Sequence, residues 1–213
     1  MKYLEILVEG AADGPTIREI LQRRFAMVES VNFRIHAHKG KGTLPKNPHK
    51  KPEKLRRGLL DLLPATLKGF ANLSADRCVI VLVDADKTPC VELKQDLLNL
   101  YGKLGKRPCC ALFRIAVEEI ESWFIADPEA IRKAYPKAKI SLLTSIPPDD
   151  VVGASELLAR ALGRKPEDCT GADKYEWATR IAPNLNLETP RSPSLNAFIT
   201  GISNLISQEG QTK

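Results

Sequence analysis

The stretch Cys78-Val79-Ile80-Val81-Leu82-Val83 runs directly into Asp84-Ala85-Asp86. An apolar run of this length, rich in Val, is typical of a strand buried on both faces of a parallel sheet. A second such run, Leu4-Glu5-Ile6-Leu7-Val8, ends at Glu9-Gly10. In open α/β sheets, ligand sites lie outside the carboxyl ends of the strands. We therefore expect Glu9, Asp84 and Asp86 along one edge of such a sheet.

The rest of the chain extends this pattern to an α/β fold. Predicted strands at residues 2–8, 31–37, 77–83 and 108–115 alternate with segments in which apolar residues recur at helical spacing. One predicted helix runs from Pro52 to about Leu63, Pro64 interrupts it, and a second predicted helical piece continues toward Leu73. The order βαβαβαβ, followed by further helices, predicts a mainly parallel four-stranded sheet with a helical C-terminal extension. We place the core at residues 1–137 and the extension at residues 138–213, packed together as one unit.

The composition excludes a membrane-spanning protein. Hydrophobic residues make up 43% and charged residues 27% of the 213 residues, which is ordinary for a soluble globular protein. The longest apolar stretch is too short to cross a bilayer, and Glu5 and Glu9 interrupt any signal-peptide core. We expect a cytoplasmic protein with no membrane partner. The five cysteines show no zinc-site spacing, so we expect reduced, buried thiols.

Positive charge is concentrated in one segment. The net charge is +6, and residues 39–57 contain eight Lys or Arg residues against the single acid Glu53. Several Gly and Pro residues share this segment, which predicts a flexible basic loop. Such a loop either contacts phosphate groups, with Lys39 and Lys41 following a nucleic-acid backbone, or is a solvated linker.

The acidic residues suit a hard divalent metal. Side chains two residues apart in an extended chain point the same way, so Asp84 and Asp86 can converge on one Mg²⁺ or Mn²⁺ ion. The alternative for this pair is an ordinary turn. Glu118 and Glu121 share one face of a predicted helix, either as functional groups or as favourable charges near its N-terminus. Asp127 is placed to cap the next helix.

Two common nucleotide-binding motifs are absent from the sequence. The residues after Glu9-Gly10 do not give G-x-G-x-x-G, and no G-K-[ST] follows any predicted strand. These absences argue against the usual NAD(P)-binding and P-loop ATPase functions.

Val8-Glu9-Gly10 and Asp84-Ala85-Asp86, each ending a predicted strand, resemble the Toprim domain of topoisomerases, primases and overcoming-lysogenization-defect nucleases. More closely, the chain is similar to a family of uncharacterised bacterial Toprim-like proteins, catalogued as a domain of unknown function. The match extends over most of the chain, and the Glu-Ser-Trp-Phe-Ile-Ala-Asp segment is its most specific part. The further matching segments are Gly40-Lys41-Gly42, residues 115–127, Lys174 and Arg191-Ser192-Pro193-Ser194.

The resemblance implies a Toprim-like, Rossmann-like core and metal-dependent hydrolysis of phosphodiester bonds in nucleic acid, in phage defence or a mobile element. Mg²⁺ or Mn²⁺ would bind at Glu9, Asp84 and Asp86. Because Lys87-Thr88-Pro89 follows Asp86, no third Asp extends the motif. A second metal would therefore need Glu118, Glu121 or a distant acid. The predicted residues are Glu9, Asp84, Asp86 and Glu121 for catalysis, Glu118 as a further metal ligand, and Lys39, Lys41, Lys174 and Arg191 for substrate.

The partners that this reading implies are nucleic acid, with DNA ahead of RNA, an ATPase subunit, and a second copy of the chain in a homodimer. Two alternatives stay open. Asp84-Ala85-Asp86-Lys87-Thr88 also fits the D-x-D-x-T motif of haloacid dehalogenase-type phosphatases, with Asp84 as nucleophile and Asp86 as general acid/base. Thr144, Ser145, Lys165 and Asp149-Asp150 would supply the later motifs. Otherwise the acidic site is vestigial, and the chain binds nucleic acid or a partner without catalysis.

Overall fold

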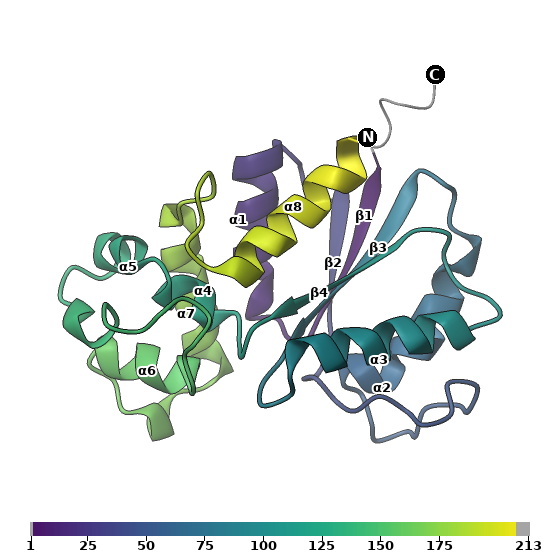
Figure 1. Ribbon diagram of the computed structural model, residues 1–213, viewed down its shortest axis with the longest axis horizontal. Helices are drawn as coiled ribbons and strands as arrows, with labels where there is room; N and C mark the ends of the chain where they lie inside the picture. Colours follow the sequence, from purple (N-terminus) through teal and green to yellow (C-terminus); the bar gives the residue numbers. More distant parts are fainter. Residues whose placement is uncertain (1, 208–213) are drawn as a thin grey trace.

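A four-stranded parallel sheet forms the centre of the computed structural model, which describes residues 2–207 (Figure 1). Its strands lie in the order β2-β1-β3-β4, and every neighbouring pair is parallel. The predicted α/β class and the four-stranded parallel sheet are confirmed. The strands are β1 (Tyr3–Val8), β2 (Phe33–Ala37), β3 (Arg77–Asp84) and β4 (Ala111–Ala116).

Helices cover both faces of the sheet, because successive side chains of a buried strand point to opposite sides. Leu4 and Ile6 of β1 belong to an apolar cluster with α1 (Asp13–Phe25) and α8 (Pro193–Ser207). Leu7 belongs to a second cluster, with α2 (Leu59–Gly69) and α3 (Cys90–Lys103). The central strands β1 and β3 are buried on both faces, which explains why they read as nearly continuous apolar runs.

The strand order creates a crevice between β1 and β3. From β1 the chain crosses to β2 on one side, and later it continues from β3 to β4 on the other side. At such a switch point the connections leave in opposite directions, so the carboxyl ends of the two strands are left uncovered. Glu9 directly follows β1, and Asp84 is the last residue of β3. The topology therefore brings these two acids to the edge where a ligand fits best.

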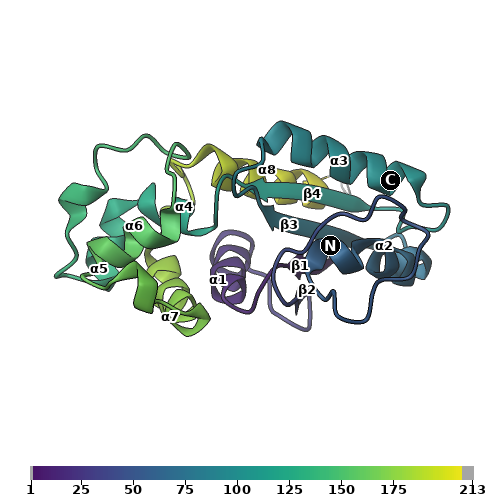
Figure 2. The ribbon, with the colours of Figure 1, turned by 90° about the horizontal axis from the view of Figure 1, so that it is seen from below.

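The remaining helices gather at one end of the molecule (Figures 1 and 2). Trp177 and Phe198, both from the predicted extension, are fully buried in the same apolar cluster as Leu4 and Ile17. The C-terminal helices thus share a core with the sheet. The helices at this end are α4 (Glu121–Ile125), α5 (Pro128–Ala134), α6 (Ala154–Ala161) and α7 (Gly171–Ile181), with short 3-10 turns at Ile140–Leu142, Pro166–Asp168 and Ala182–Asn184. A further 3-10 turn, Phe70–Asn72, directly follows α2.

Within residues 2–207, no helix has both the length and the apolar character that crossing a bilayer requires. The predicted cap at Asp127 is confirmed, since its Oδ1 accepts a hydrogen bond from the Ala130 N–H at 3.1 Å.

Helix α2 departs from the sequence-based expectation at both ends. It begins at Leu59 rather than Pro52, and Pro64 lies inside it rather than interrupting it. The start is fixed by Asp61, whose Oδ2 accepts a hydrogen bond from the Gly58 N–H at 3.2 Å. Pro64 forfeits one backbone hydrogen bond, but it is buried, so packing offsets the loss. The basic residues before Gly58 stay in a loop.

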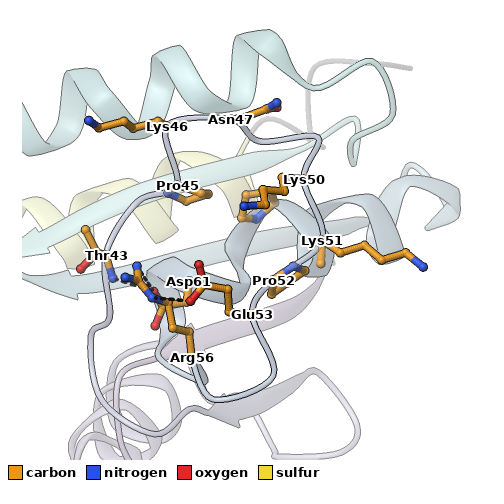
Figure 3. A pocket seen from close by; sticks show the side chains of 12 residues that line it. Thr43, Pro45, Lys46, Asn47, Lys50, Lys51, Pro52, Glu53, Arg56 and Asp61 are labelled. Atoms are coloured by element: carbon orange, nitrogen blue, oxygen red, sulfur yellow. Dashed lines mark hydrogen bonds and ion pairs between the residues drawn. The ribbon is translucent and has the colours of Figure 1, made fainter.

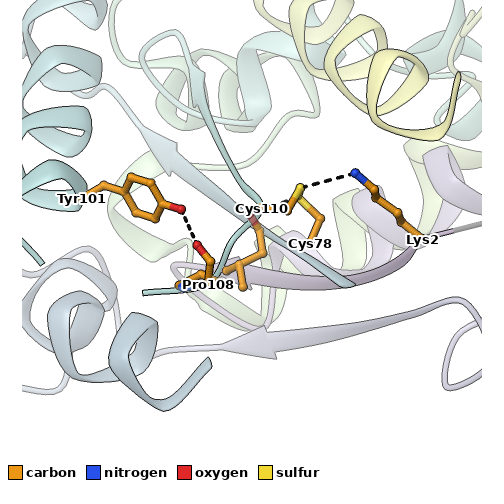
Figure 4. Close-up of a disulfide and its surroundings, with 6 residues drawn as sticks. Lys2, Cys78, Tyr101, Pro108 and Cys110 are labelled. Carbon is orange, nitrogen blue, oxygen red and sulfur yellow. Dashed lines mark hydrogen bonds between the residues drawn. A yellow bond between two sulfur atoms is a disulfide. The ribbon is translucent and has the colours of Figure 1, made fainter. Parts of the chain in front are cut away.

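The prediction of five reduced cysteines is wrong in this structure, which pairs Cys78 with Cys110 in a disulfide (Figure 4). Cys78 lies in β3, and Cys110 immediately precedes β4. The parallel register pairs Val79 with Ala111, so the two cysteines are lateral neighbours with Cα atoms 4.7 Å apart. Their spacing of 32 residues along the chain does not reveal this neighbourhood. Cys90, Cys109 and Cys169 are free.

Gly58 packs tightly against the backbone of the basic loop. A Cβ atom at this position would lie 2.8 Å from the carbonyl carbon of Lys41 and still closer to Gly42. We expect Gly58→Ala to lower the free energy of unfolding by about 1–3 kcal/mol, measured by denaturant titration. The matched control is Gly69→Ala, because Gly69 has helical backbone angles and no atom within 4 Å of an added Cβ. Equal stability of the two variants would contradict this account.

Candidate functional site

The ends of β1 and β3 are joined by one side-chain contact. Glu9 Oε1 accepts a hydrogen bond from the backbone N–H of Asp84 at 2.8 Å. Both side chains are partly buried. The predicted convergence of Glu9 and Asp84 at the sheet edge is therefore what the structure shows, and it places two carboxylates in a site with little access to water.

Asp86 lies beside this pair but faces a lysine. Lys41 Nζ donates to Asp86 Oδ2 at 2.7 Å and to the carbonyl of Ala85 at 3.1 Å. The backbone of Asp86 is left-handed, with φ 47°, so the chain turns there instead of staying extended as the i, i+2 argument assumed. The Asp86 side chain is consequently more exposed, at 53%, and its charge still acts on Glu9.

Asp13 is a site residue that the sequence analysis missed. It is the first residue of α1, and its Oδ2 accepts a hydrogen bond from the Gly10 N–H at 2.9 Å. Burial raises the pKa of Asp13 to about 6, and its charge raises the pKa of Glu9 and of Asp84. The signal was its position four residues after Glu9, at the start of the following helix.

The segment that enters α4 and the helix α7 complete the site from the helical end. Lys174 Nζ lies 3.0 Å from Glu119 Oε1 and 3.5 Å from Glu121 Oε1. Glu121 is only 7% exposed, and Glu119 also accepts a hydrogen bond from the Ser155 N–H at 3.0 Å. Glu119 was missed because Glu118 and Glu121 matched a helical face better. We call the following six residues the acidic cluster: Glu9, Asp13, Asp84, Asp86, Glu119 and Glu121.

The acidic cluster contains six carboxyl groups, and two lysines, Lys41 and Lys174, form ion pairs with it. Burial raises the pKa of Glu9 and of Glu121 to about 7. Burial, together with the charge of Glu9, raises the pKa of Asp84 well above its usual range. Burial would lower the pKa of Lys174, but the charges of Glu121 and Glu119 raise it above its ordinary value. These shifts mark a place where an added cation would be stabilised.

Glu118 has the contacts of a helix cap. Its two carboxylate oxygens accept hydrogen bonds from the N–H groups of Gly153, at 2.7 Å, and Ala154, at 2.8 Å, at the start of α6. Its backbone has φ 63°, which turns the chain between β4 and α4. Its role as a metal ligand stays a prediction, and these contacts favour a structural one.

Lys39 and Arg191 are exposed, and among residues 2–207 no ion pair links either of them to the acidic cluster. The Lys39 N–H donates to the carbonyl of Arg57 at 3.3 Å, at the base of the basic loop. Arg191 lines a separate cavity of about 310 Å³ together with Trp123 and Asp127. Of the predicted substrate-binding residues, the structure therefore brings Lys41 and Lys174 to the cluster.

Open space adjoins the cluster. A cavity of about 470 Å³ is lined by Asp86, Thr88, Glu119 and Val152, among others. Across the described part of the chain, no three His, Cys, Asp or Glu side chains already stand in a metal-coordinating arrangement. In this structure, lysines pair with Asp86, Glu119 and Glu121. Backbone N–H groups donate to Glu9 and Asp13.

Asp149, one of the two acids assigned to a later motif in the phosphatase alternative, has structural contacts. Asp149 Oδ1 accepts a hydrogen bond from the Ser192 hydroxyl, and its Oδ2 accepts one from the Ser194 N–H, each at 2.7 Å. Asp149 therefore ties the start of α8 to the preceding loop, and its hydrogen bonds do not involve Asp84.

Neutralising Glu9 tests the charge imbalance. The folded-state pKa of Glu9 is raised, so the folded state binds the extra proton and loses stability as pH rises from about 4.5 through about 7. In chelator, we expect Glu9→Gln to unfold at the same temperature as the parent near pH 5. Near pH 8 the variant should be more stable, by on the order of 1–3 kcal/mol. Thermal unfolding monitored by circular dichroism measures both, and a pH-independent difference would contradict the imbalance.

Replacing Glu118, unlike replacing Glu9, should destabilise the fold at neutral pH. Removing its carboxylate leaves two amides at the start of α6 without partners, so Glu118→Ala should cost about 1–2 kcal/mol of unfolding free energy at neutral pH. Chemical denaturation measures this difference, and an unchanged free energy of unfolding in Glu118→Ala would contradict the capping role.

Comparisons with known proteins fit this architecture. A family model described as a domain of unknown function (DUF4276) matches residues 8–203. No curated protein matches the chain in sequence. Among solved structures, the C-terminal region of the OLD protein of Xanthomonas campestris pv. campestris is similar in fold, with a TM-score of 0.53 and 14% identity over 99% of each chain. The family match covers most of the chain, so the protein belongs to the DUF4276 family.

Proposed function

We propose that the protein is a divalent-metal-dependent, Toprim-like phosphodiesterase that cleaves nucleic acid. The observation that carries this proposal is the contact between Glu9 and Asp84 across the β1–β3 crevice, with further carboxylates packed around it. Carboxylates crowd in this way where they share a cation. The similarity in fold to the C-terminal region of an OLD protein also supports this proposal.

The donor set fits Mg²⁺ or Mn²⁺. Glu9, Asp84 and Asp86 offer only carboxylate oxygens, which hard divalent cations prefer. When bound, the metal neutralises charge at the scissile phosphate and orients the attacking water. Asp86 now pairs with Lys41, and it would hold the metal together with Glu9 and Asp84 when Lys41 pairs with a phosphate group of the substrate instead.

The chain's own cations act on the substrate. Lys174 projects from α7 into the acidic cluster, where Glu119 and Glu121 hold it in place. It would contact a phosphate oxygen and stabilise the charge that develops as the ester bond breaks. Glu121 acts as a positioning residue for Lys174, since its carboxylate is buried against the ammonium group. Lys41 binds the strand on the other side of the crevice.

The wider context of this activity is also a proposal. We place the protein in phage defence or a mobile element, in the cytoplasm, with DNA as the preferred substrate. An ATPase subunit and a second copy of the chain are the protein partners that we propose.

A second candidate function has one observation in its favour. Lys41 and Lys174 already pair with Asp86 and Glu119, and the described residues hold no ready-made metal shell. A chain arranged in this way can bind nucleic acid or a partner without cleaving anything. The two functions differ in whether turnover depends on Asp84.

The test is incubation of the protein with single- and double-stranded DNA and RNA, in Mg²⁺, Mn²⁺ or chelator. We expect cleavage that requires the metal and falls by about 100-fold or more in Asp84→Asn. The matched control is Asp168→Asn, which removes an exposed carboxylate from the 3-10 turn Pro166–Asp168 at the helical end and should cleave like the parent. Equal rates in the two variants would refute the proposal, and binding without cleavage would favour the second function.

A further inference from the structure

The basic loop of residues 39–57 is fastened to the candidate site at both of its ends. The Gly40 N–H donates to the carbonyl of Glu9 at 2.9 Å. The Leu59 N–H donates to the carbonyl of Gly40 at 2.8 Å, and the Leu60 N–H donates to the carbonyl of Lys41 at 2.7 Å. The loop therefore leaves the sheet beside Glu9 and returns to the same place. Whatever binds it lies next to the acidic cluster.

This loop encloses a pocket over α2. Figure 3 shows the chain curving from Thr43 to Arg56 around a cavity of about 330 Å³. Asp61, Pro64 and Ala65 of α2 form its floor, and Lys68 of the same helix holds the far side of the loop through the carbonyl of Pro48, at 2.8 Å. The pocket is thus built from two elements and is not a gap in a loose segment.

The cations of the pocket outnumber its acids, and the acids are already engaged. Glu53 pairs with Arg56 at 3.4 Å. Asp61 accepts hydrogen bonds from the N–H groups of Thr43, at 3.1 Å, and Gly58, at 3.2 Å. Within residues 2–207, no carboxylate lies within ion-pair distance of the three lysines that line the pocket, which we call the loop lysines: Lys46, Lys50 and Lys51.

We propose that this pocket binds the phosphodiester backbone of the nucleic-acid strand whose cleavage is proposed above, a few nucleotides from the scissile bond. The inference rests on that proposed function. Thr43, on the rim, is two residues from Lys41, so their Cα atoms lie within about 7 Å of each other. A strand held by Lys41 beside Asp86 therefore enters the pocket directly.

The chemistry of the lining suits a strand backbone. The loop lysines supply point charges for phosphate oxygens, and Pro45, Pro52 and Pro64 give an apolar wall for the sugars. Figure 3 shows Lys46 and Lys51 extending outward from opposite sides of the loop and away from each other, so their ammonium groups lie apart and do not surround one point. Such an arrangement fits an extended polyanion better than a single small anion.

The test measures binding in an Asp84→Asn background, where cleavage does not interfere. Labelled single- and double-stranded oligonucleotides are titrated by fluorescence anisotropy at several NaCl concentrations, in Mg²⁺ and in chelator. The variant replaces the three loop lysines by Gln. The control replaces Lys137, Lys139 and Lys165, three exposed lysines of the helical end, so that the net charge of the two variants is equal.

We expect the loop variant to bind about tenfold or more weakly, with a dependence of log K on log salt that is less steep by about 2–3. The control should stay within about twofold of the parent. Equal losses in the two variants would overturn the pocket. In the Asp84-containing protein, the loop variant should raise KM and leave kcat unchanged, and a lost kcat would assign the lysines to the reaction itself.

The outcomes separate this inference from the proposed function. Lysine-dependent binding without cleavage by any version of the chain would support the pocket and refute the phosphodiesterase. Cleavage to which the loop lysines make no contribution would support the phosphodiesterase and refute the pocket. Failure of the parent to bind any nucleic acid would overturn the pocket, whatever the activity.

Discussion

The constraint on which the site depends is the crowding of carboxylates at the β1–β3 crevice. The strand order leaves the carboxyl ends of these two strands uncovered, and both end in an acid. One hydrogen bond from the Asp84 amide orients Glu9, but it does not cancel the charge of either side chain. Burial, and after it the charges of the neighbouring carboxylates, raise the pKa of both Glu9 and Asp84. Lys41 and Lys174 offset part of this negative charge through their contacts with Asp86 and Glu119.

The helical part of the chain completes the edge of the sheet. Glu118, in the link between β4 and α4, holds the first amides of α6, while Ser155 of α6 orients Glu119. Glu119 in turn holds Lys174 of α7 over the crevice. These contacts form one chain of hydrogen bonds from the sheet to α7. A sheet without these helices would present the same acids with one cation fewer.

Sequence patterns predicted the parts of this site that are local. Apolar runs located β1 and β3, and hence Glu9 and Asp84, because a strand buried on both faces needs no information from elsewhere in the chain. Lys174 was identified only through a family resemblance, since its contact with Glu119 joins residues 55 positions apart. Asp13 and Glu119 were missed because their roles depend on where a helix begins and on the left-handed turn at Glu118. Predicting the Cys78–Cys110 disulfide would have required the register of β3 and β4. Pro64 lies inside α2 because burial of its side chain offsets the lost backbone hydrogen bond, which a local pattern does not reveal.

The arrangement of charge explains why metal and nucleic acid would assist each other at this site. Without a metal, Lys41 is held by Asp86 and Lys174 by Glu119 and Glu121, so neither cation is free for a phosphate. A divalent cation held as proposed by Glu9, Asp84 and Asp86 would neutralise part of their charge and so would weaken the attraction of these acids for the lysines. The lysines would then be available to an incoming phosphate, whose own charge would in turn stabilise the metal. Each ligand would lower the electrostatic free energy of binding the other. Such a coupling between two binding events is reciprocal.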